Sequence, residues 1–239
     1  MTQEIFRDEP YLAEADAVVA SRDARGIVLD RTIFYPRGGG QAGDAGVMVR
    51  AGGGQIAIAD TVKGEAPGEI VHVPAPGQEA ALETLAPGET VHLRLDWVRR
   101  HRHMRFHTAT HLLCAIVAHE TNGCSITADY ARLDFDMVEP LDREHLEREL
   151  ARLVEEAHET RTVWITDEEL DAKPELVRTM SVKPPRGVGR IRLLQIEGVD
   201  LQACGGTHVA QTGEIGRIEC IKIENKGKMN RRFVIALAD

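Results

Sequence analysis

The 239-residue chain has no long hydrophobic run and no N-terminal secretory signal. No apolar stretch approaches the roughly 18 residues that a membrane-spanning helix needs. We therefore expect a cytoplasmic protein and not an exported or membrane protein. A chain of this length can hold one large domain or two small ones, with a sizeable core.

Disulfide frameworks, repeats and nucleotide-binding loops are also missing. The cysteines stand at spacings that suggest no disulfide pattern: Cys114, Cys124, Cys204 and Cys220. We find no internal repeat and no low-complexity tract. The glycine-rich segment at residues 34–44 lacks the strand–GxxxxGKS/T–helix pattern of a P-loop. It is either a flexible turn or a loop whose backbone N–H groups approach a ligand.

The formal net charge of −9 at first argues against a nucleic-acid partner. The negative charge is concentrated, however, because residues 139–175 contain 13 acidic and 5 basic residues. The rest of the chain is nearly neutral and includes basic clusters. One face could therefore bind a polyanion while the acidic region faces away.

Hydrophobic patterning divides the chain into two parts. Short β-type runs separated by Gly, Pro and Asp clusters predict a small barrel. They lie at residues 17–20, 26–34, 46–50, 55–62, 69–73 and 89–96, with residues 75–88 as a connector. After Trp97 the spacing becomes helical, and we expect Gly123 to end the helix. Further on, Thr166 and Glu169 fit a capping box. The predicted fold class is α+β.

Two short motifs carry the chemistry. His107 and His111 are four residues apart, so on a helix their rings share one face. Cys204 and His208 have the same spacing, but two intervening glycines favour a loop. Three imidazoles and one thiolate are a ligand set that suits Zn²⁺.

The chemistry of such a site has limits. In the common zinc-protease helix the residue after the first histidine is a general-base Glu, but here it is Thr108. Four protein ligands would close a tetrahedral site, which is the structural pattern. Catalysis then needs an open coordination position on the metal, more than four ligands, or one of the four residues not bound directly to the metal. Thr108, Thr110, Gln202 and Thr207 lie beside the ligands and could orient water or substrate, or support the ligands.

These motifs resemble a known family. Residues 105–113, with 204–209, are similar to the editing domain of alanyl-tRNA synthetase and to the free-standing AlaX-type alanyl-tRNA editing proteins. A related domain occurs in threonyl-tRNA synthetase. Residues 34–44 resemble the family's glycine motif, and residues 132–135 also fit its pattern.

The resemblance implies an architecture and a function. It implies an N-terminal β-barrel, residues 1–96, and a zinc-binding editing domain, residues 97–239, in which helices pack on an antiparallel sheet. It also implies hydrolysis of the ester of mischarged tRNA(Ala), chiefly Ser-tRNA(Ala) and in some members Gly-tRNA(Ala). No obligate protein partner is evident.

The resemblance implies the metal ligands and a supporting role for the glycine loop, and the other candidate residues are our own hypotheses from their position and chemistry. The zinc ligands would be His107, His111, Cys204 and His208. Catalytic candidates are Thr108, Gln202 and Thr207. Candidates for contact with the substrate or its serine hydroxyl are Gly39, Gly40, Gln41, Ser125 and Thr127. Basic residues for the tRNA acceptor end are Arg105, Arg186, Lys226, Lys228, Arg231 and Arg232.

Three other functions stay open. A non-catalytic tRNA-binding module with a structural zinc would unfold without metal and would deacylate nothing. A zinc hydrolase for small esters or amides would turn over its substrates without salt sensitivity. An editing protein for a different misacylated tRNA is a close variant.

Overall fold

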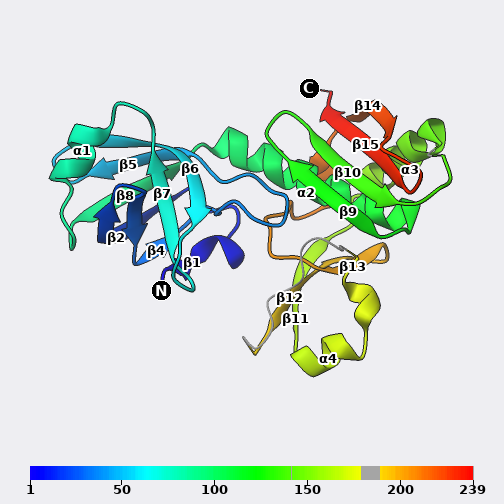
Figure 1. The fold of residues 1–239 in the computed structure, drawn as a ribbon, viewed down its shortest axis with the longest axis horizontal. Helices are drawn as coiled ribbons and strands as arrows, with labels where there is room; N and C mark the ends of the chain where they lie inside the picture. Colours follow the sequence, from blue (N-terminus) through cyan, green and yellow to red (C-terminus); the bar gives the residue numbers. More distant parts are fainter. Residues whose placement is uncertain (141, 179–188, 239) are drawn as a thin grey trace. The chain divides into compact units, whose positions relative to one another are not determined.

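The computed structural model describes residues 1–140, 142–178 and 189–238 (Figure 1). The chain forms two compact units, Met1–Gly38 with Ala42–His101 and Gly39–Gln41 with Arg102–Asp239. We refer to them as the barrel unit and the helix–sheet unit. The predicted boundary between residues 96 and 97 stays a prediction.

The barrel unit is a closed antiparallel barrel with strand order β2-β3-β7-β6-β5-β8. Its strands are β2 (Glu14–Asp23), β3 (Gly26–Leu29), β5 (Gly46–Arg50), β6 (Gln55–Lys63), β7 (Ile70–Pro74) and β8 (Thr90–Leu95). The short strands β1 (Gln3–Glu4) and β4 (Arg31–Thr32) pair in parallel, and a 3-10 turn spans Ile5–Arg7. The predicted barrel is therefore confirmed.

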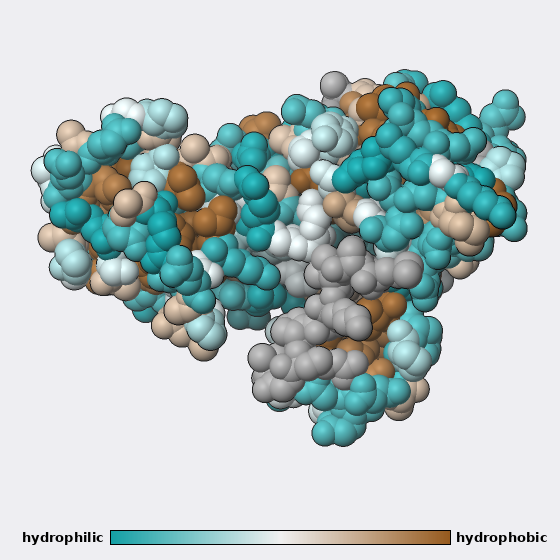
Figure 2. Space-filling model, in the orientation of Figure 1, coloured by the Kyte–Doolittle hydropathy of each residue, from teal (hydrophilic) through white to brown (hydrophobic). Residues whose placement is uncertain are grey.

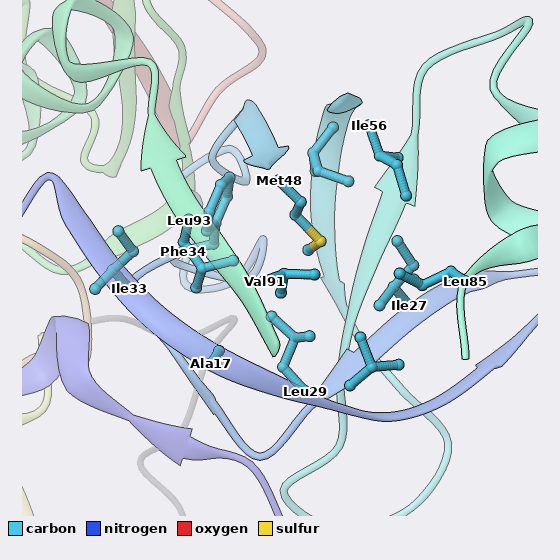
Figure 3. Close-up of a cluster of buried hydrophobic side chains, with 12 residues drawn as sticks. Ala17, Ile27, Leu29, Ile33, Phe34, Met48, Ile56, Leu85, Val91 and Leu93 are labelled. Atoms are coloured by element: carbon cyan, nitrogen blue, oxygen red, sulfur yellow. The ribbon is translucent and has the colours of Figure 1, made fainter. Parts of the chain in front are cut away.

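The barrel core consists of side chains that alternate inward along the strands. Met48, Ile56, Val91 and Leu93 are buried and belong to one cluster, drawn in Figure 3. The connector after β7 contains a helix that the sequence patterning missed, α1 (Glu79–Thr84). The Pro, Gly, Ala and Glu composition of the connector indicated a loop. The helix has only six residues, which is too few to show helical periodicity.

A buried ion pair closes the base of the glycine-rich segment. The Arg100 side chain is fully buried, and its Nε lies 2.9 Å from Asp44 Oδ2. Its terminal nitrogens also donate to the carbonyls of Pro10 and Ile33. Asp44 Oδ2 accepts from the Tyr35 backbone N–H at 2.6 Å, and Asp44 N donates to Tyr35 O. The two ends of the segment are thus held together.

A neutral histidine inside the barrel makes its stability sensitive to acid. His72 is fully buried, with Nδ1 3.0 Å from Ile27 O and Nε2 2.7 Å from Thr32 Oγ1. Burial lowers its pKa from 6.5 to about 4. The unfolded chain therefore binds a proton first as the pH falls. We expect the free energy of unfolding to drop by about 3 kcal/mol between pH 6.5 and 4 from this residue.

Chemical denaturation across that pH range tests the expectation. The His72→Gln variant should lose this part of the pH dependence. The control is His92→Gln, because surface His92 has a raised pKa, through its hydrogen bond to Asp16. That residue stabilises the fold below its unfolded pKa and loses the effect as pH rises. Equal acid sensitivity of wild type and His72→Gln would contradict the assignment.

The helix–sheet unit contains two antiparallel sheets. One has the order β14-β15-β10-β9 and the other β11-β12-β13. The strands are β9 (Thr121–Ile126), β10 (Ala131–Asp136), β11 (Thr160–Ile165), β12 (Ile191–Ile196), β13 (Asp200–Ala203), β14 (Ile218–Asn225) and β15 (Asn230–Leu237). The helices are α2 (Trp97–Val117), which begins in the barrel unit, α3 (Arg143–Glu155) and α4 (Asp167–Asp171). Short 3-10 turns span Pro174–Leu176 and Thr212–Ile215. The predicted α+β fold class is confirmed.

Local signals set the N-termini of two helices, α3 and α4. The Asp142 side chain caps α3 by accepting from His145 N, and Thr166 and Glu169 form the predicted capping box of α4. The expectation that Gly123 ends α2 is wrong. The helix ends at Val117, Ala118 takes a positive φ of 57°, and Gly123 lies within β9.

Hydrophilic residues cover most of the surface of the helix–sheet unit that is visible in Figure 2. Helix α3 contacts β14. Among the described residues, no helix has the length and apolar character needed to cross a membrane. Gln41 forms a parallel bridge with Ile126, so the tip of the glycine-rich segment is attached to β9.

Candidate metal centre

Four side chains from two distant motifs meet in the helix–sheet unit. His107 and His111 lie one turn apart on α2, with ring centroids 5.4 Å apart. Cys204 and His208 lie in the loop after β13. One ligand atom from each residue lies within 4.8 Å of the others, and the three histidines are buried. The structure therefore brings together all four predicted ligands.

The Cys204–His208 segment is a loop, as its two glycines predicted. Cys204 N donates to Arg192 O at 3.1 Å, and Arg192 Nη1 donates to the carbonyls of Cys204 and Gly206 at 2.9 and 3.0 Å. A Cβ on Gly206 would lie 2.2 Å from His107 Cε1. Only glycine permits the backbone to pass this close to the imidazole.

Each histidine has its Nδ1 occupied by a protein acceptor. His107 Nδ1 donates to Gln41 Oε1 at 2.7 Å, and His111 Nδ1 to Asp200 Oδ2 at 3.2 Å. His208 Nδ1 lies 3.4 Å from Thr108 Oγ1, whose hydroxyl donates to a backbone carbonyl and so can accept. These partners place the proton on Nδ1, which leaves each Nε2 lone pair for the centre.

Cys204 has the electrostatic environment of a thiolate ligand. Its Sγ lies 3.5 Å from His107 Nε2 and 3.2 Å from His208 Nε2. Burial acts to raise the pKa of this thiol, but the two imidazoles outweigh burial and hold the pKa well below its usual range. In contrast, burial raises the pKa of Cys114 and of Cys124 to about 12. Of these three thiols, Cys204 alone has a lowered pKa, which favours the thiolate form that a metal would bind.

Burial and hydrogen bonding shift the pKa values of two of these histidines in opposite directions. Burial lowers the pKa of His208 well below its usual range. Burial also acts to lower the pKa of His111, but its hydrogen bonds to Asp200 and Cys204 raise that pKa to about 9. The donor set of three imidazoles and one thiolate, all facing one point, fits a Zn²⁺ ion.

The three predicted catalytic residues surround the ligands, and each has protein partners. Thr108 faces His208, as described above. Thr207 is fully buried, accepts from Gln41 Nε2 at 2.9 Å and donates its backbone N–H to Gln41 Oε1. Gln202 Nε2 donates to Asp200 Oδ2 at 2.7 Å. These contacts hold the groups that orient the ligands; direct action on substrate stays a prediction.

The predicted substrate-contact residues occupy different surroundings. Gly39 and Gly40 both take positive φ, 60° and 87°, and Gly40 O accepts from Ile126 N. Gln41 is fully buried against His107 and Thr207. Thr127 Oγ1 donates to Tyr130 O in the β9–β10 turn. Their roles in substrate recognition stay predictions.

The predicted tRNA-contact residues differ in whether their charged groups already contact other protein groups. Arg105 donates to Ile215 O, the Arg231 guanidinium donates to the carbonyls of Gly227 and Val138, and Arg232 pairs with Asp134 at 2.7 Å. Lys226 lies 3.5 Å from Glu224. Lys228 is exposed and makes no ion pair within the described ranges. Arg186 lies outside the described residues. A role for these residues in tRNA binding stays a prediction.

Two residues that contact the candidate ligands were not predicted from the sequence. Asp200 contacts His111 across 89 positions, and Arg192 braces the Cys204 loop. Neither lies in a recognisable motif, and a single buried Asp or Arg has no sequence signature. The one available signal was the position of Asp200, four residues before Cys204.

Family comparisons cover both parts of the chain. Residues 191–234 match the family described as "Threonyl and Alanyl tRNA synthetase second additional domain". Residues 5–99 match the family described as "tRNA synthetases class II (A)". The first match contains the Cys204–His208 loop, and the second contains the barrel strands.

Individual relatives align over nearly the whole chain. The alanyl-tRNA editing protein AlaX-M of Methanosarcina mazei is 36% identical over all of this chain and 98% of its own length. AlaX-M of Saccharolobus solfataricus is 33% identical over 97% of both chains. An alanine–tRNA ligase of Ignicoccus hospitalis is 35% identical over 92% of this chain but only 24% of its own length.

Proposed function

Because the chain belongs to the AlaX family of alanyl-tRNA editing proteins, we propose that it hydrolyses the ester of mischarged tRNA(Ala). The main substrate in this proposal is Ser-tRNA(Ala), with Gly-tRNA(Ala) as a second one. The reaction takes place on the tRNA acceptor end, in the cytoplasm, with Zn²⁺ in the site.

One observation carries the proposal. The ligand atoms of His107, His111, Cys204 and His208 lie within 4.8 Å of one another, although the two motifs are about a hundred residues apart. Such convergence of three imidazoles and a low-pKa thiol is a strong sign of a metal site. The full-length similarity to named editing proteins supports assigning that site to aminoacyl-ester hydrolysis.

The chain's residues prepare the site for this reaction. A bound Zn²⁺ would polarise the ester carbonyl or lower the pKa of a water. Gln41, Thr108 and Asp200 hold the three rings with Nε2 inward. Thr207 in turn holds Gln41 by two hydrogen bonds, so the His107 ring is fixed through two layers of contacts. Such hydrogen bonds keep the histidine rings oriented toward the metal position.

The need for the activity follows from substrate size. An alanine pocket cannot strongly reject glycine, nor an analogue that merely adds a hydroxyl. A second, hydrolytic site then removes the wrong product. Binding of tRNA would use exposed cations such as Lys228, and the affinity should fall with added salt.

A non-catalytic tRNA-binding module with a structural zinc is the competing function. The same four residues favour this function, because four protein ligands would leave no open coordination position on a tetrahedral zinc. It predicts zinc-dependent folding and tRNA binding without hydrolysis.

The first test compares hydrolysis of Ser-tRNA(Ala), Gly-tRNA(Ala) and Ala-tRNA(Ala) by zinc-loaded protein. We expect rapid loss of serine, with Ala-tRNA(Ala) left intact. A chelator should stop the reaction, and added Zn²⁺ should restore it. Circular dichroism on the chelated protein checks that the fold persists.

Two outcomes would redirect the assignment. Folded, zinc-loaded protein that binds tRNA but hydrolyses none of the three substrates favours the binding module. Equal hydrolysis of serine and alanine would oppose an editing role, because an editing enzyme must spare the correct product.

A further inference from the structure

A buried carboxylate lies directly behind one metal-ligand candidate. Asp200 opens β13, and its side chain is 0% exposed. Its Oδ2 lies 3.2 Å from His111 Nδ1, the ring nitrogen that faces away from the centre. His107 and His208 have neutral partners at the same position, Gln41 and Thr108. Among the three histidines, therefore, His111 alone has a carboxylate partner at Nδ1 within the described residues.

Two further side chains hold this carboxylate. Gln202 Nε2 donates to the same oxygen, Asp200 Oδ2, at 2.7 Å. Arg178 Nη2 lies 3.7 Å from the other oxygen, Oδ1. Gln202 lies on the same strand as Asp200 and two residues later, so β13 presents both side chains on one face.

Arg178 also connects the carboxylate to the helix that carries His111. Its Nη1 donates at 2.9 Å to the carbonyl of Cys114, which lies three residues after His111 on α2. The backbone carbonyl of Arg178 accepts from Thr121 N at 2.9 Å, at the start of β9. The guanidinium thus bridges the helix and the carboxylate, and both are fixed relative to the ring.

Burying a carboxylate is unfavourable unless neighbouring groups compensate for its lost hydration. Here the compensation comes from a ligand imidazole, an amide and a guanidinium. A carboxylate that accepts from the outer nitrogen of a metal-bound histidine fixes the ring's tautomer and orientation and strengthens it as a ligand.

From this arrangement we propose that Asp200 is the positioning residue of the metal centre for His111, and that Gln202 and Arg178 act through it. This inference rests on the metal site of the proposed function, but it does not depend on the tRNA substrate. Loss of the carboxylate leaves the His111 ring free to turn, so metal affinity should fall while the fold persists.

The test is Zn²⁺ affinity, measured by competition with a chromophoric chelator. We expect Asp200→Ala to raise the Kd for Zn²⁺ by about 10- to 100-fold. Asp200→Asn should recover part of the affinity, because its amide oxygen can still accept from His111. Gln202→Ala should weaken binding by a smaller factor, since it removes only one support of the carboxylate.

The matched control is Asp134→Ala. Asp134 is buried in the same unit and pairs with Arg232, so its loss should lower thermal stability without changing the Kd for Zn²⁺. Unchanged zinc affinity in Asp200→Asn and Gln202→Ala would overturn the proposal, even if Asp200→Ala does not fold. If the Asp200 variants bind Zn²⁺ more weakly than wild type, but wild type hydrolyses no aminoacyl-tRNA, only the proposed activity is contradicted.

Discussion

Replacing Gly206 with alanine should lower Zn²⁺ affinity and deacylation of Ser-tRNA(Ala), the latter by about 100-fold. The added Cβ would lie 2.2 Å from His107 Cε1, 2.4 Å from His107 Nδ1 and 2.9 Å from Gln41 Oε1. These atoms are a ring and its hydrogen-bond partner, so one of them must move. The φ of Gly206 is not positive, so an alanine there would not strain the backbone itself. The effect should appear in metal affinity and rate more than in stability.

The control for that variant is Gly52→Ala. Gly52 lies in a hairpin turn of the barrel, where an added Cβ would meet no atom within 4 Å, and its φ is not positive. Its variant should match wild type in metal affinity, rate and melting temperature. Wild-type zinc binding and hydrolysis in Gly206→Ala would mean that His107 does not need its observed position.

Replacing Asp44 with alanine should have the largest effect on stability, a loss of about 3–5 kcal/mol. The change leaves the fully buried Arg100 guanidinium without its carboxylate and removes the acceptor of the Tyr35 N–H. Natural domains are stable by about 5–15 kcal/mol, so the loss is a large part of the total. Urea denaturation followed by circular dichroism measures it.

Two variants control the Asp44 measurement. Asp44→Asn keeps an acceptor for Tyr35 and should fall between wild type and Asp44→Ala. Asp23→Ala breaks an exposed pair with Arg25 on the β2–β3 hairpin, and it should change stability little. If Asp44→Ala were no less stable than Asp23→Ala, the buried pair would not be needed to close the glycine-rich segment.

The barrel strands were predictable because each is encoded locally. Alternation within β5 and β6 and the glycine and proline clusters between strands can be read without knowledge of partners. Helix ends were less predictable. Gly123 looked like a helix stop, yet α2 ends six residues earlier, and Gly123 pairs with Asp134 in the β9–β10 ladder. Such pairing is a long-range contact that overrides the local preference of glycine.

The cluster of four candidate metal ligands was also predictable, because residue type and spacing are properties of short segments. The i,i+4 pair His107 and His111 indicates a helix face, and the glycines before His208 indicate a loop. The roles of their neighbours were not. Thr108, Gln202 and Thr207 were candidates for catalysis on proximity in sequence alone, whereas their contacts identify the protein groups that each one holds.

By itself the sequence determined which atoms can bind a metal and where strands and helices begin to form, since both depend on residues close together in the chain. The tertiary structure decided how the side chains that carry those atoms are oriented. Gln41 reaches His107 across 66 positions and Asp200 reaches His111 across 89. No local pattern specifies such pairs, because hydrogen bonds of this range depend on how helix, strand and loop pack together.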